Sequence, residues 1–261
     1  MTMKKARRTH LFMIAAAAVF SMVAGCSCDQ DESLSRVRKA GRITIATSAG
    51  YSPFSFYNDK KELIGFDIDV AKELAKRLSV DLEIVDTPWE GILNGLNARR
   101  YDGILGSMSV TEARRSVVGF STPYYYSRTC VMVKVGSPFK KQANLQGKTI
   151  GVAAGTTFER DAGRIGAKNI RHYASDDEAL MGLQRGEVDA VITDEIVSTY
   201  MATRKKVPIK RLGDTLGEEQ IAAVFRKEDK TLLAEVNHAL KAMQKDGFIR
   251  DLIDKMAKKG Y

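Results

Sequence analysis

The chain has 261 residues, of which 44% are hydrophobic, and a formal net charge of +9. Its length supports one large or two modest domains with cores of their own, so the fold does not need disulfide bonds. The charge does not indicate nucleic-acid binding, because residues 1–25 carry four of the cations and no acid. The remaining lysines and arginines form no basic stripe interleaved with aromatic residues.

The N-terminus has the pattern of an export signal. The basic stretch KKARRTH precedes the apolar run LFMIAAAAVFSMVAG, which is short for a membrane span. The tetrapeptide VAGC at its end resembles the lipobox of bacterial lipoproteins. That resemblance implies that Cys26 is acylated and that the protein is held to a membrane, in the periplasm or another extracytoplasmic space. The alternative is an ordinary secretory signal with an incidental cysteine.

A short polar segment follows the signal. Residues 1–25 are predicted to form the signal peptide and residues 26–37 a tether. The two other cysteines, Cys28 and Cys130, could form a disulfide bond, but a buried thiol at Cys130 and an exposed one at Cys28 are favoured, because a flexible tether rarely holds disulfide geometry. The histidines are far apart and no CxxC or HExxH motif is present, so no metal site is expected.

Two segments of the chain share one pattern. LNGLNARRYDGILGS (93–107) and LMGLQRGEVDAVITD (180–194) each read as an amphipathic helix that runs into a strand. Before them, RITIATSAGYSPF and KTIGVAAGTTF read as short strands that end in glycine-rich turns. The sequence therefore predicts an α/β protein with two similar lobes.

Two stretches connect these lobes. YYYSRTCVMVKV leads out of the first lobe, and GEEQIAAVFRKED returns the chain to it, so two hinge strands are expected. Lobe one is predicted to contain residues 38–126 and 221–261, and lobe two residues 127–220. Ligand sites often lie between domains and beyond the carboxyl ends of strands, so the residues that follow each strand are the candidates.

The stretch SMSVTEARR follows a strand of the first lobe. Ser109 and Glu112 have the spacing of a capping box, and the helix start that this predicts attracts anions. Arg114 would lie in the first turns, where the helix dipole disfavours a cation. An anion bound beside it explains that placement, and a guanidinium binds a carboxylate through two hydrogen bonds. Arg114 is therefore predicted to bind a carboxylate, with a solvated surface arginine as the alternative, while Arg115 is expected at the surface.

The second lobe has a similar capping-box pattern, but its candidate ligand-binding residue is an acid where the first lobe has an arginine. Thr156 and Glu159 again have capping-box spacing, and Thr156 and Thr157 offer hydroxyl and amide donors. Asp194 ends a strand in DAVITDE, where it could bind an ammonium group. The alternative is that Asp194 caps the next helix, because Asp is a favoured N-cap residue. One lobe would then bind the carboxylate and the other the amine of a zwitterion.

Aromatic residues follow two of the predicted strands. Tyr51 in SAGYSPF and Trp89 in DTPWEG are placed where flat rings could enclose a ligand side chain. Their alternative role is core packing, which is the expectation for Phe54 and Phe56.

From Arg36 to the C-terminus the chain resembles the polar amino-acid family of solute-binding proteins that serve bacterial ABC importers. The resemblance is carried by motifs in order, including IGFDIDVAKELAKRL, YDGILGSMSVTEARRSVVGFSTPYY, LQGKTIGVAAGTTFE and VDAVITDE. It implies a two-lobed periplasmic-binding-protein fold of the Venus-flytrap type. It also implies a monomer that binds an amino acid, needs no cofactor, and delivers its ligand to the membrane subunits of an importer.

The resemblance also assigns residues to the ligand. Arg114 matches the arginine that binds the α-carboxylate, and Asp194 matches the acid that binds the α-amine. The aromatic walls match Tyr51 and Trp89. The other contact positions match Gly106, Ser107, Ser109, Thr156 and Thr157.

The chain departs from the family at positions that affect the ligand side chain. Relatives that take cationic side chains often carry an acid where this chain has Ser48, and Ala153 and Thr193 add no charge in lobe two. These residues favour a neutral or small polar side chain, although Glu90 or Asp86 could still reach a basic one. More distant relatives are dehydratases and receptor sensor domains, but no titratable group beyond the clamp is expected in the cleft, so no enzyme is predicted.

Overall fold

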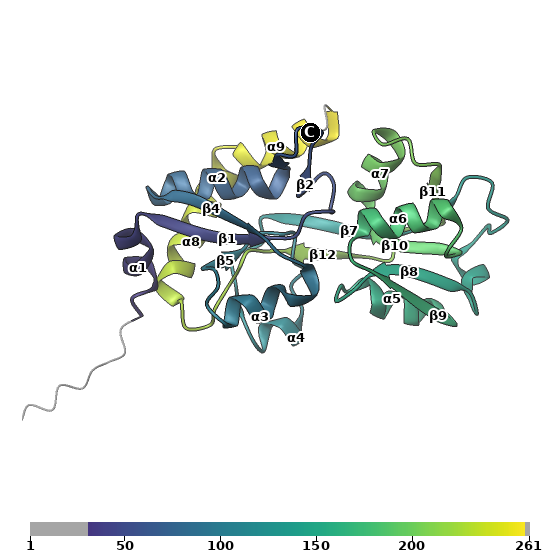
Figure 1. Cartoon of the computed structure of the whole chain (residues 1–261), viewed down its shortest axis with the longest axis horizontal. Helices are drawn as coiled ribbons and strands as arrows, with labels where there is room; N and C mark the ends of the chain where they lie inside the picture. Colours follow the sequence, from purple (N-terminus) through teal and green to yellow (C-terminus); the bar gives the residue numbers. More distant parts are fainter. Residues whose placement is uncertain (1–30, 259–261) are drawn as a thin grey trace, which may run out of the picture. The chain divides into compact units, whose positions relative to one another are not determined.

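The computed structural model describes residues 31–258. The predicted signal peptide, Cys26 and Cys28 lie outside the described residues. Within them the chain forms two α/β lobes, each built around its own sheet, as the sequence predicted (Figure 1). Among the described helices, none is both long and apolar enough to cross a membrane.

Lobe one contains a five-stranded sheet in the order β4-β1-β5-β13-β6. Strand β1 pairs in parallel with β4 and β5, and β13 pairs antiparallel with β5 and β6. The elements of this lobe, with η for a 3₁₀ helix, are α1 (Ser33–Ala40), β1 (Arg42–Thr47), β2 (Phe56–Tyr57), β3 (Leu63–Ile64), α2 (Phe66–Leu78), β4 (Asp81–Asp86), η1 (Trp89–Gly91), α3 (Ile92–Asn97), β5 (Gly103–Ile104), α4 (Glu112–Arg115), β6 (Gly119–Phe120), β13 (Val224–Phe225), α8 (Lys230–Lys245) and α9 (Phe248–Lys258).

Lobe two contains a sheet in the order β11-β7-β10-β8-β9, and β12 pairs with β7. Strands β10, β8 and β9 are parallel, whereas β7 runs antiparallel to its neighbours. The elements of this lobe are β7 (Tyr125–Lys134), η2 (Gln142–Leu145), β8 (Thr149–Ala153), α5 (Phe158–Ile165), β9 (Asn169–Tyr173), α6 (Asp176–Arg185), β10 (Ala190–Asp194), α7 (Glu195–Thr203), β11 (Ile209–Arg211) and β12 (Gly217–Ile221).

Helices cover both faces of the second sheet. Successive side chains of a strand point to opposite faces. Accordingly, Val191 of β10 belongs to the cluster that contains Leu183 of α6, while Ile192 belongs to the cluster that contains Phe158 of α5. Strands β8 and β10 are therefore buried on both sides, and their carboxyl ends are left as the place where polar loops can gather.

Strands β7 and β12 join the two lobes. They pair antiparallel from Tyr125↔Ile221 to Thr129↔Gly217, and they lie between the lobes in Figure 1. The predicted lobe boundaries at residues 126 and 221 fall at these strands. Because both strands run from one lobe into the other, the boundaries remain predictions.

The internal repeat is visible in three dimensions. Its helices are α3 and α6, and each leads into a strand of its own sheet, β5 and β10. The glycines that match in the repeat, Gly95 and Gly182, have the same packing role. A Cβ at Gly95 would lie 2.2 Å from the hydroxyl of Tyr101, and one at Gly182 would lie 2.4 Å from that of Tyr173. Each helix therefore needs a glycine so that a tyrosine can pack against it.

Candidate functional site

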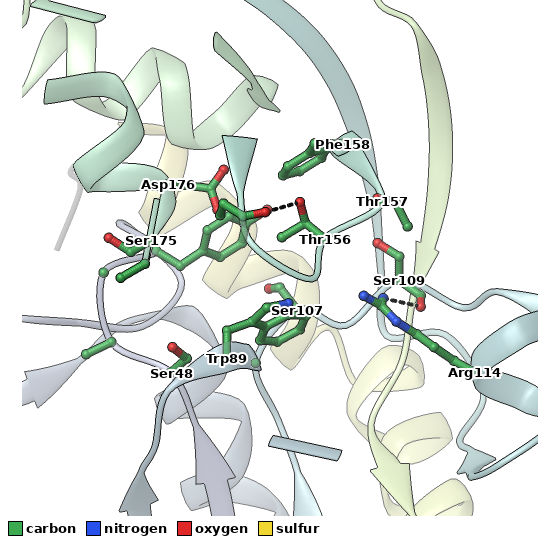
Figure 2. Close-up of a pocket in the computed structure, with 16 residues that line it drawn as sticks. Ser48, Trp89, Ser107, Ser109, Arg114, Thr156, Thr157, Phe158, Ser175 and Asp176 are labelled. Carbon is green, nitrogen blue, oxygen red and sulfur yellow. Dashed lines mark hydrogen bonds between the residues drawn. The ribbon is translucent and has the colours of Figure 1, made fainter. Parts of the chain in front are cut away.

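A pocket lies between the two lobes at the carboxyl ends of their strands, with about 500 Å³ of space that includes its open mouth. Figure 2 shows the residues around it. Eight of the nine residues predicted to bind the ligand line this pocket: Tyr51, Trp89, Gly106, Ser107, Ser109, Arg114, Thr156 and Thr157. The lining residues that the sequence did not assign to the ligand are Ser48, Ala49, Gly50, Ala153, Phe158, Ala174, Ser175 and Asp176.

Helix α4 does not begin at the predicted residue. It starts at Glu112, and the hydroxyl of Thr111 accepts the N-cap hydrogen bond from the backbone N–H of Arg114. The predicted capping box at Ser109 is therefore wrong. Ser109 forms a β-bridge with Ile221, and its hydroxyl donates to Oε2 of Glu219 over 2.5 Å. Glu219, a hinge-strand residue distant in sequence, thus accepts the hydrogen bond of the hydroxyl that the local pattern assigned to the helix end.

The guanidinium of Arg114 lies at the pocket with most of its donors unused. It donates to the carbonyl of Ser109 over 2.9 Å and to that of Gly155 over 3.0 Å, and it stacks on the ring of Trp89 at 5.6 Å from the centroid. A guanidinium has five N–H donors, so three have no partner among the described residues. Burial lowers the pKa of Arg114, and no carboxylate of the described chain lies within 4.0 Å of it.

Arg115 has a different environment, as the sequence predicted. It is exposed and lies 3.9 Å from the carboxylate of Glu112. Of the two adjacent arginines, Arg114 therefore lines the pocket and Arg115 lies on the surface.

The second predicted capping box also does not form. Helix α5 begins at Phe158, with Thr157 at the N-cap position and no side-chain hydrogen bond to the helix end. The hydroxyl of Thr156 donates to the carbonyl of Ala153 over 2.7 Å, and that of Thr157 donates to Glu219 over 3.0 Å. The first N–H groups of α5 therefore have no side-chain cap where Thr156, Thr157 and Phe158 line the pocket.

Asp194 is the predicted site residue that does not line the pocket. It is buried at the N-cap of α7, where its Oδ1 accepts from the N–H groups of Ile196 over 2.6 Å and Val197 over 3.2 Å. The hydroxyl of Ser127 donates to its other oxygen. The helix-cap alternative for Asp194 is thus realised in the structure, and its role in binding an amine stays a prediction. Burial raises its pKa to about 6.

Sequence analysis missed Asp176, the carboxylate that does line the pocket. Asp176 is the first residue of α6, three residues after β9, and its Oδ1 accepts a hydrogen bond from Thr193 over 2.6 Å. Burial, together with the charges of Asp177 and Asp194, raises its pKa to about 7. The expectation that the cleft holds no further titratable group is therefore wrong. No strand was predicted before Asp176, so the sequence analysis had no local signal for it.

Tyr51 lies near buried carboxylates, and Ser107 is held in place by one. Burial raises the pKa of Tyr51, and the nearby charges of Asp194 and Asp176 raise it further. Ser107 has a left-handed backbone with φ of 52°. Its hydroxyl donates to Asp67 over 2.8 Å, and Asp67 also accepts from the hydroxyl of Tyr124 over 2.6 Å. The pocket wall at Ser107 is therefore fixed by a hydrogen-bonded group beneath it.

The lobes touch on two sides of the pocket. On one side, Trp89 and Arg114 of lobe one both donate to the carbonyl of Gly155 in lobe two. On another, the hydroxyl of Ser52 donates to Asp177 over 2.7 Å, and the N–H of Asp177 donates to the carbonyl of Gly50 over 3.1 Å. The structure is therefore a closed arrangement of the two lobes.

No group of His, Cys, Asp and Glu side chains within residues 31–258 is arranged to hold a metal ion. The pocket is built instead from an arginine, an aspartate, hydroxyl groups and aromatic rings. Such a set can bind a small zwitterion, with one charge at each end.

Two curated proteins of known ligand resemble the chain over most of its length. The L-cystine-binding protein TcyJ of Escherichia coli is 30% identical over 241 residues, which cover 90% of this chain and 91% of that protein. The histidine-binding periplasmic protein of Salmonella typhimurium is 32% identical over 231 residues, with coverage of 84% and 87%.

The fold has a close counterpart among solved structures. A mutant of ArgBP from T. maritima superposes with a TM-score of 0.80 at 32% identity, over 85% of this chain and 98% of that one. Residues 43–259 match the family described as bacterial extracellular solute-binding proteins, family 3. The relatives are binding proteins, not enzymes. The chain belongs to family 3 of the bacterial extracellular solute-binding proteins.

Proposed function

We propose that the protein is the substrate-binding component of an ABC importer and that it binds an amino acid between its lobes. The family match supports a solute-binding role. The relatives named for L-cystine and histidine support an amino acid as the ligand. The membrane subunits of the importer would be its protein partners, and the protein would act as a monomer without a cofactor.

The observation that carries this proposal is the environment of Arg114. The partly buried guanidinium forms no ion pair within 4.0 Å in the described chain and feels the charge of Glu219 only from farther away, so its unused donors can receive a ligand carboxylate. The uncapped first turn of α5 lies on the other side of the same pocket and favours an anion. A carboxylate between them would receive hydrogen bonds from both lobes, with Ser107, Ser109, Thr156 and Thr157 around it.

Lobe two would hold the amine. The family pattern assigns this role to Asp194, whose carboxylate lies close enough to the lining residue Tyr51 for its charge to raise the pKa of that hydroxyl. With Arg114 on one lobe and the acid on the other, a zwitterion makes its full set of contacts only when the lobes are closed. Tyr51 and Trp89 would enclose the side chain of the ligand.

The nature of that side chain depends on Asp176. The preference for a neutral or small polar side chain rested on Ser48, Ala153 and Thr193, none of which carries a charge. In the structure, Thr193 donates its hydroxyl hydrogen bond to Asp176, which is an acid at the pocket. The absence of an acid therefore no longer argues against a basic ligand.

The lipid anchor belongs to the same proposal. Acylation of Cys26 would hold the protein to a membrane on the extracytoplasmic side, with the residues between Cys26 and α1 as a tether. The predicted end of the tether at residue 37 is wrong, because α1 begins at Ser33 and buries Val37. Attachment through two or more acyl chains is stable where a single chain is not. Anchoring would keep the binding protein close to its importer.

A thermal-shift screen of the twenty common amino acids tests the binding function. One-site binding at a ligand concentration about 100 times the Kd stabilises the folded state by about 2.7 kcal/mol, so a true ligand raises the Tm by several degrees. Nuclear magnetic resonance of the ligand after long incubation should show no turnover. If no amino acid raises the Tm, or if the ligand is chemically changed, the proposal is wrong.

A further inference from the structure

We infer that Asp176 determines which amino acid is bound, because its carboxylate receives a cationic group at the end of the ligand side chain. This inference rests on the proposed function and narrows it to amino acids with a basic side chain. The site residues predicted from the family pattern do not include Asp176.

The position of Asp176 in the pocket supports this role. In Figure 2, Arg114 and Ser109 lie on one side of the pocket, and Asp176, Ser175 and Ser48 lie on the opposite side. The ring of Trp89 lies between the two sides. A ligand whose α-carboxylate is bound by Arg114 therefore extends its other end toward Asp176.

The carboxylate of Asp176 has an acceptor to offer. The residue is 4% exposed, and its Oδ1 is engaged by Thr193. Its Oδ2 has no hydrogen-bond partner among the described residues, although the side chain lines the pocket. Oδ2 is not among the fully buried side-chain atoms that lack a partner, so it can accept a hydrogen bond from a ligand group in the pocket.

The charges around Asp176 favour a cation over a neutral donor. No Lys, Arg or His of the described chain forms an ion pair with it, whereas two other carboxylates, Asp177 and Asp194, lie close enough to interact with it. The charge of Lys205 acts on the neighbouring Asp177, where it opposes the rise in pKa that burial causes. The other near neighbours, Thr193 and Ser175, are uncharged. The end of the pocket opposite Arg114 is therefore negative and lacks a positive partner from the protein.

Closure of the lobes places Asp176 away from solvent. Asp177, the next residue, accepts from Ser52 and donates to Gly50 of lobe one, which covers the start of α6. A cation that reaches Asp176 would be bound in a site of low dielectric, where a charge pair is stronger than in water. A neutral side chain of the same length would leave the carboxylate without a partner. The difference in affinity between cationic and neutral ligands should therefore be large.

Isothermal titration with matched ligands tests this assignment. Lysine and norleucine differ in one terminal ammonium group, and arginine and citrulline differ in the charge of an otherwise similar end. The wild-type protein should bind lysine or arginine at least about 30-fold more tightly than its neutral counterpart, because an unpaired buried charge costs that much or more. In Asp176→Asn, which can keep the bond from Thr193, this ratio should fall close to unity, because the cationic ligand loses its partner and the neutral ligand no longer leaves a carboxylate unpaired.

Two variants serve as controls. Glu178→Gln removes the same charge from the same turn of α6, but Glu178 is exposed and does not line the pocket, so the ratio should be kept. Asp176→Glu keeps the charge and should keep a preference for the cation. If neither variant at position 176 folds, as judged by circular dichroism, its role is structural and the assignment is wrong.

The remaining outcomes separate the two levels of the account. If the wild type binds no amino acid, the proposed function fails and the inference fails with it. If the wild type binds amino acids without preferring the cationic member of either pair, the inference alone is wrong. It is also wrong if Asp176→Asn weakens charged and neutral ligands equally, because Asp176 would then contact the α-amine or support the fold.

Discussion

The guanidinium of Arg114 in lobe one donates a hydrogen bond over 3.0 Å to the carbonyl of Gly155 in lobe two. The indole N–H of Trp89 donates to the same oxygen over 3.3 Å. The residue proposed to bind the ligand carboxylate therefore also joins the lobes. Ligand binding and lobe closure share a group, so a change at Arg114 affects both.

Arg114→Ala should weaken amino-acid binding by about 2 to 5 kcal/mol, because the ligand carboxylate would be buried without its partner. The fold should be retained, since the side chain bonds only backbone carbonyls within the described chain. Titration calorimetry measures the loss. Arg115→Ala is the matched control and should bind as the wild type does; equal losses in the two variants would contradict the assignment.

Gly50→Ala should hinder lobe closure. A Cβ at Gly50 would lie 2.7 Å from the Cβ of Ser175 in lobe two, and Gly50 has φ of 96°. Affinity for the amino acid should therefore fall, and the ligand should stabilise the variant less in thermal melts. Gly136→Ala controls for backbone strain, because Gly136 has φ of 86° and no atom within 4 Å of the added Cβ. Unchanged affinity in Gly50→Ala would show that closure does not bring these residues together.

Asp176→Asn should change how stability depends on pH. The pKa of Asp176 is raised from 3.8 to about 7 in the folded protein. Between these values the folded state holds a proton that the unfolded state has released, so this contribution to stability is complete below 3.8 and is lost as the pH rises through about 7. The asparagine side chain does not ionise, so the variant does not lose stability in this pH range through this group.

Urea unfolding at about pH 5 and about pH 8 measures that difference. The free energy of unfolding of Asp176→Asn, minus that of the wild type, should become more positive at the higher pH. The change should be of the order of 1.4 kcal/mol for each unit of pKa shift that lies within the interval. A difference that becomes more negative would mean that the folded pKa is lowered and not raised.

The two-lobed α/β fold could be predicted from the sequence because its signals are local and repeated. The helices and strands of 93–107 and 180–194 follow the apolar periodicity, and both occur as predicted. The cap positions could not be predicted in the same way. Ser109 and Thr157 have hydroxyl groups that bond to Glu219, a residue more than sixty positions away. Such a tertiary contact overrides a local capping pattern.

The pocket was predictable to a similar degree. Residues that follow strands converge on it, which is a property of α/β topology. Asp194 also lies at the end of a strand, but its carboxylate bonds to the first N–H groups of α7 and does not line the pocket. Asp176 occupies the pocket because β9 and β10 place the start of α6 beside Thr193. That arrangement depends on the packing of three elements, so no short motif reveals it.

Cys26→Ala tests the anchor. If VAGC is a lipobox, the variant should be absent from the membrane fraction or remain unprocessed, because acyl chains dominate the membrane affinity of an anchored protein. Metabolic labelling with a fatty acid and membrane fractionation report the result. Cys28→Ala is the neighbouring control and should behave as the wild type does. Unchanged labelling in Cys26→Ala would place the lipid elsewhere.

The central claim is that one amino acid is bound by both lobes and thereby closes them. Small-angle X-ray scattering with and without the amino acid that most raises the Tm measures this directly. The radius of gyration should fall when the ligand is added to the wild type, because the ligand stabilises the closed form. Arg114→Ala should show no such change at a ligand concentration that saturates only the wild type. Tight binding to the wild type without any compaction would contradict the account and indicate recognition by a single lobe.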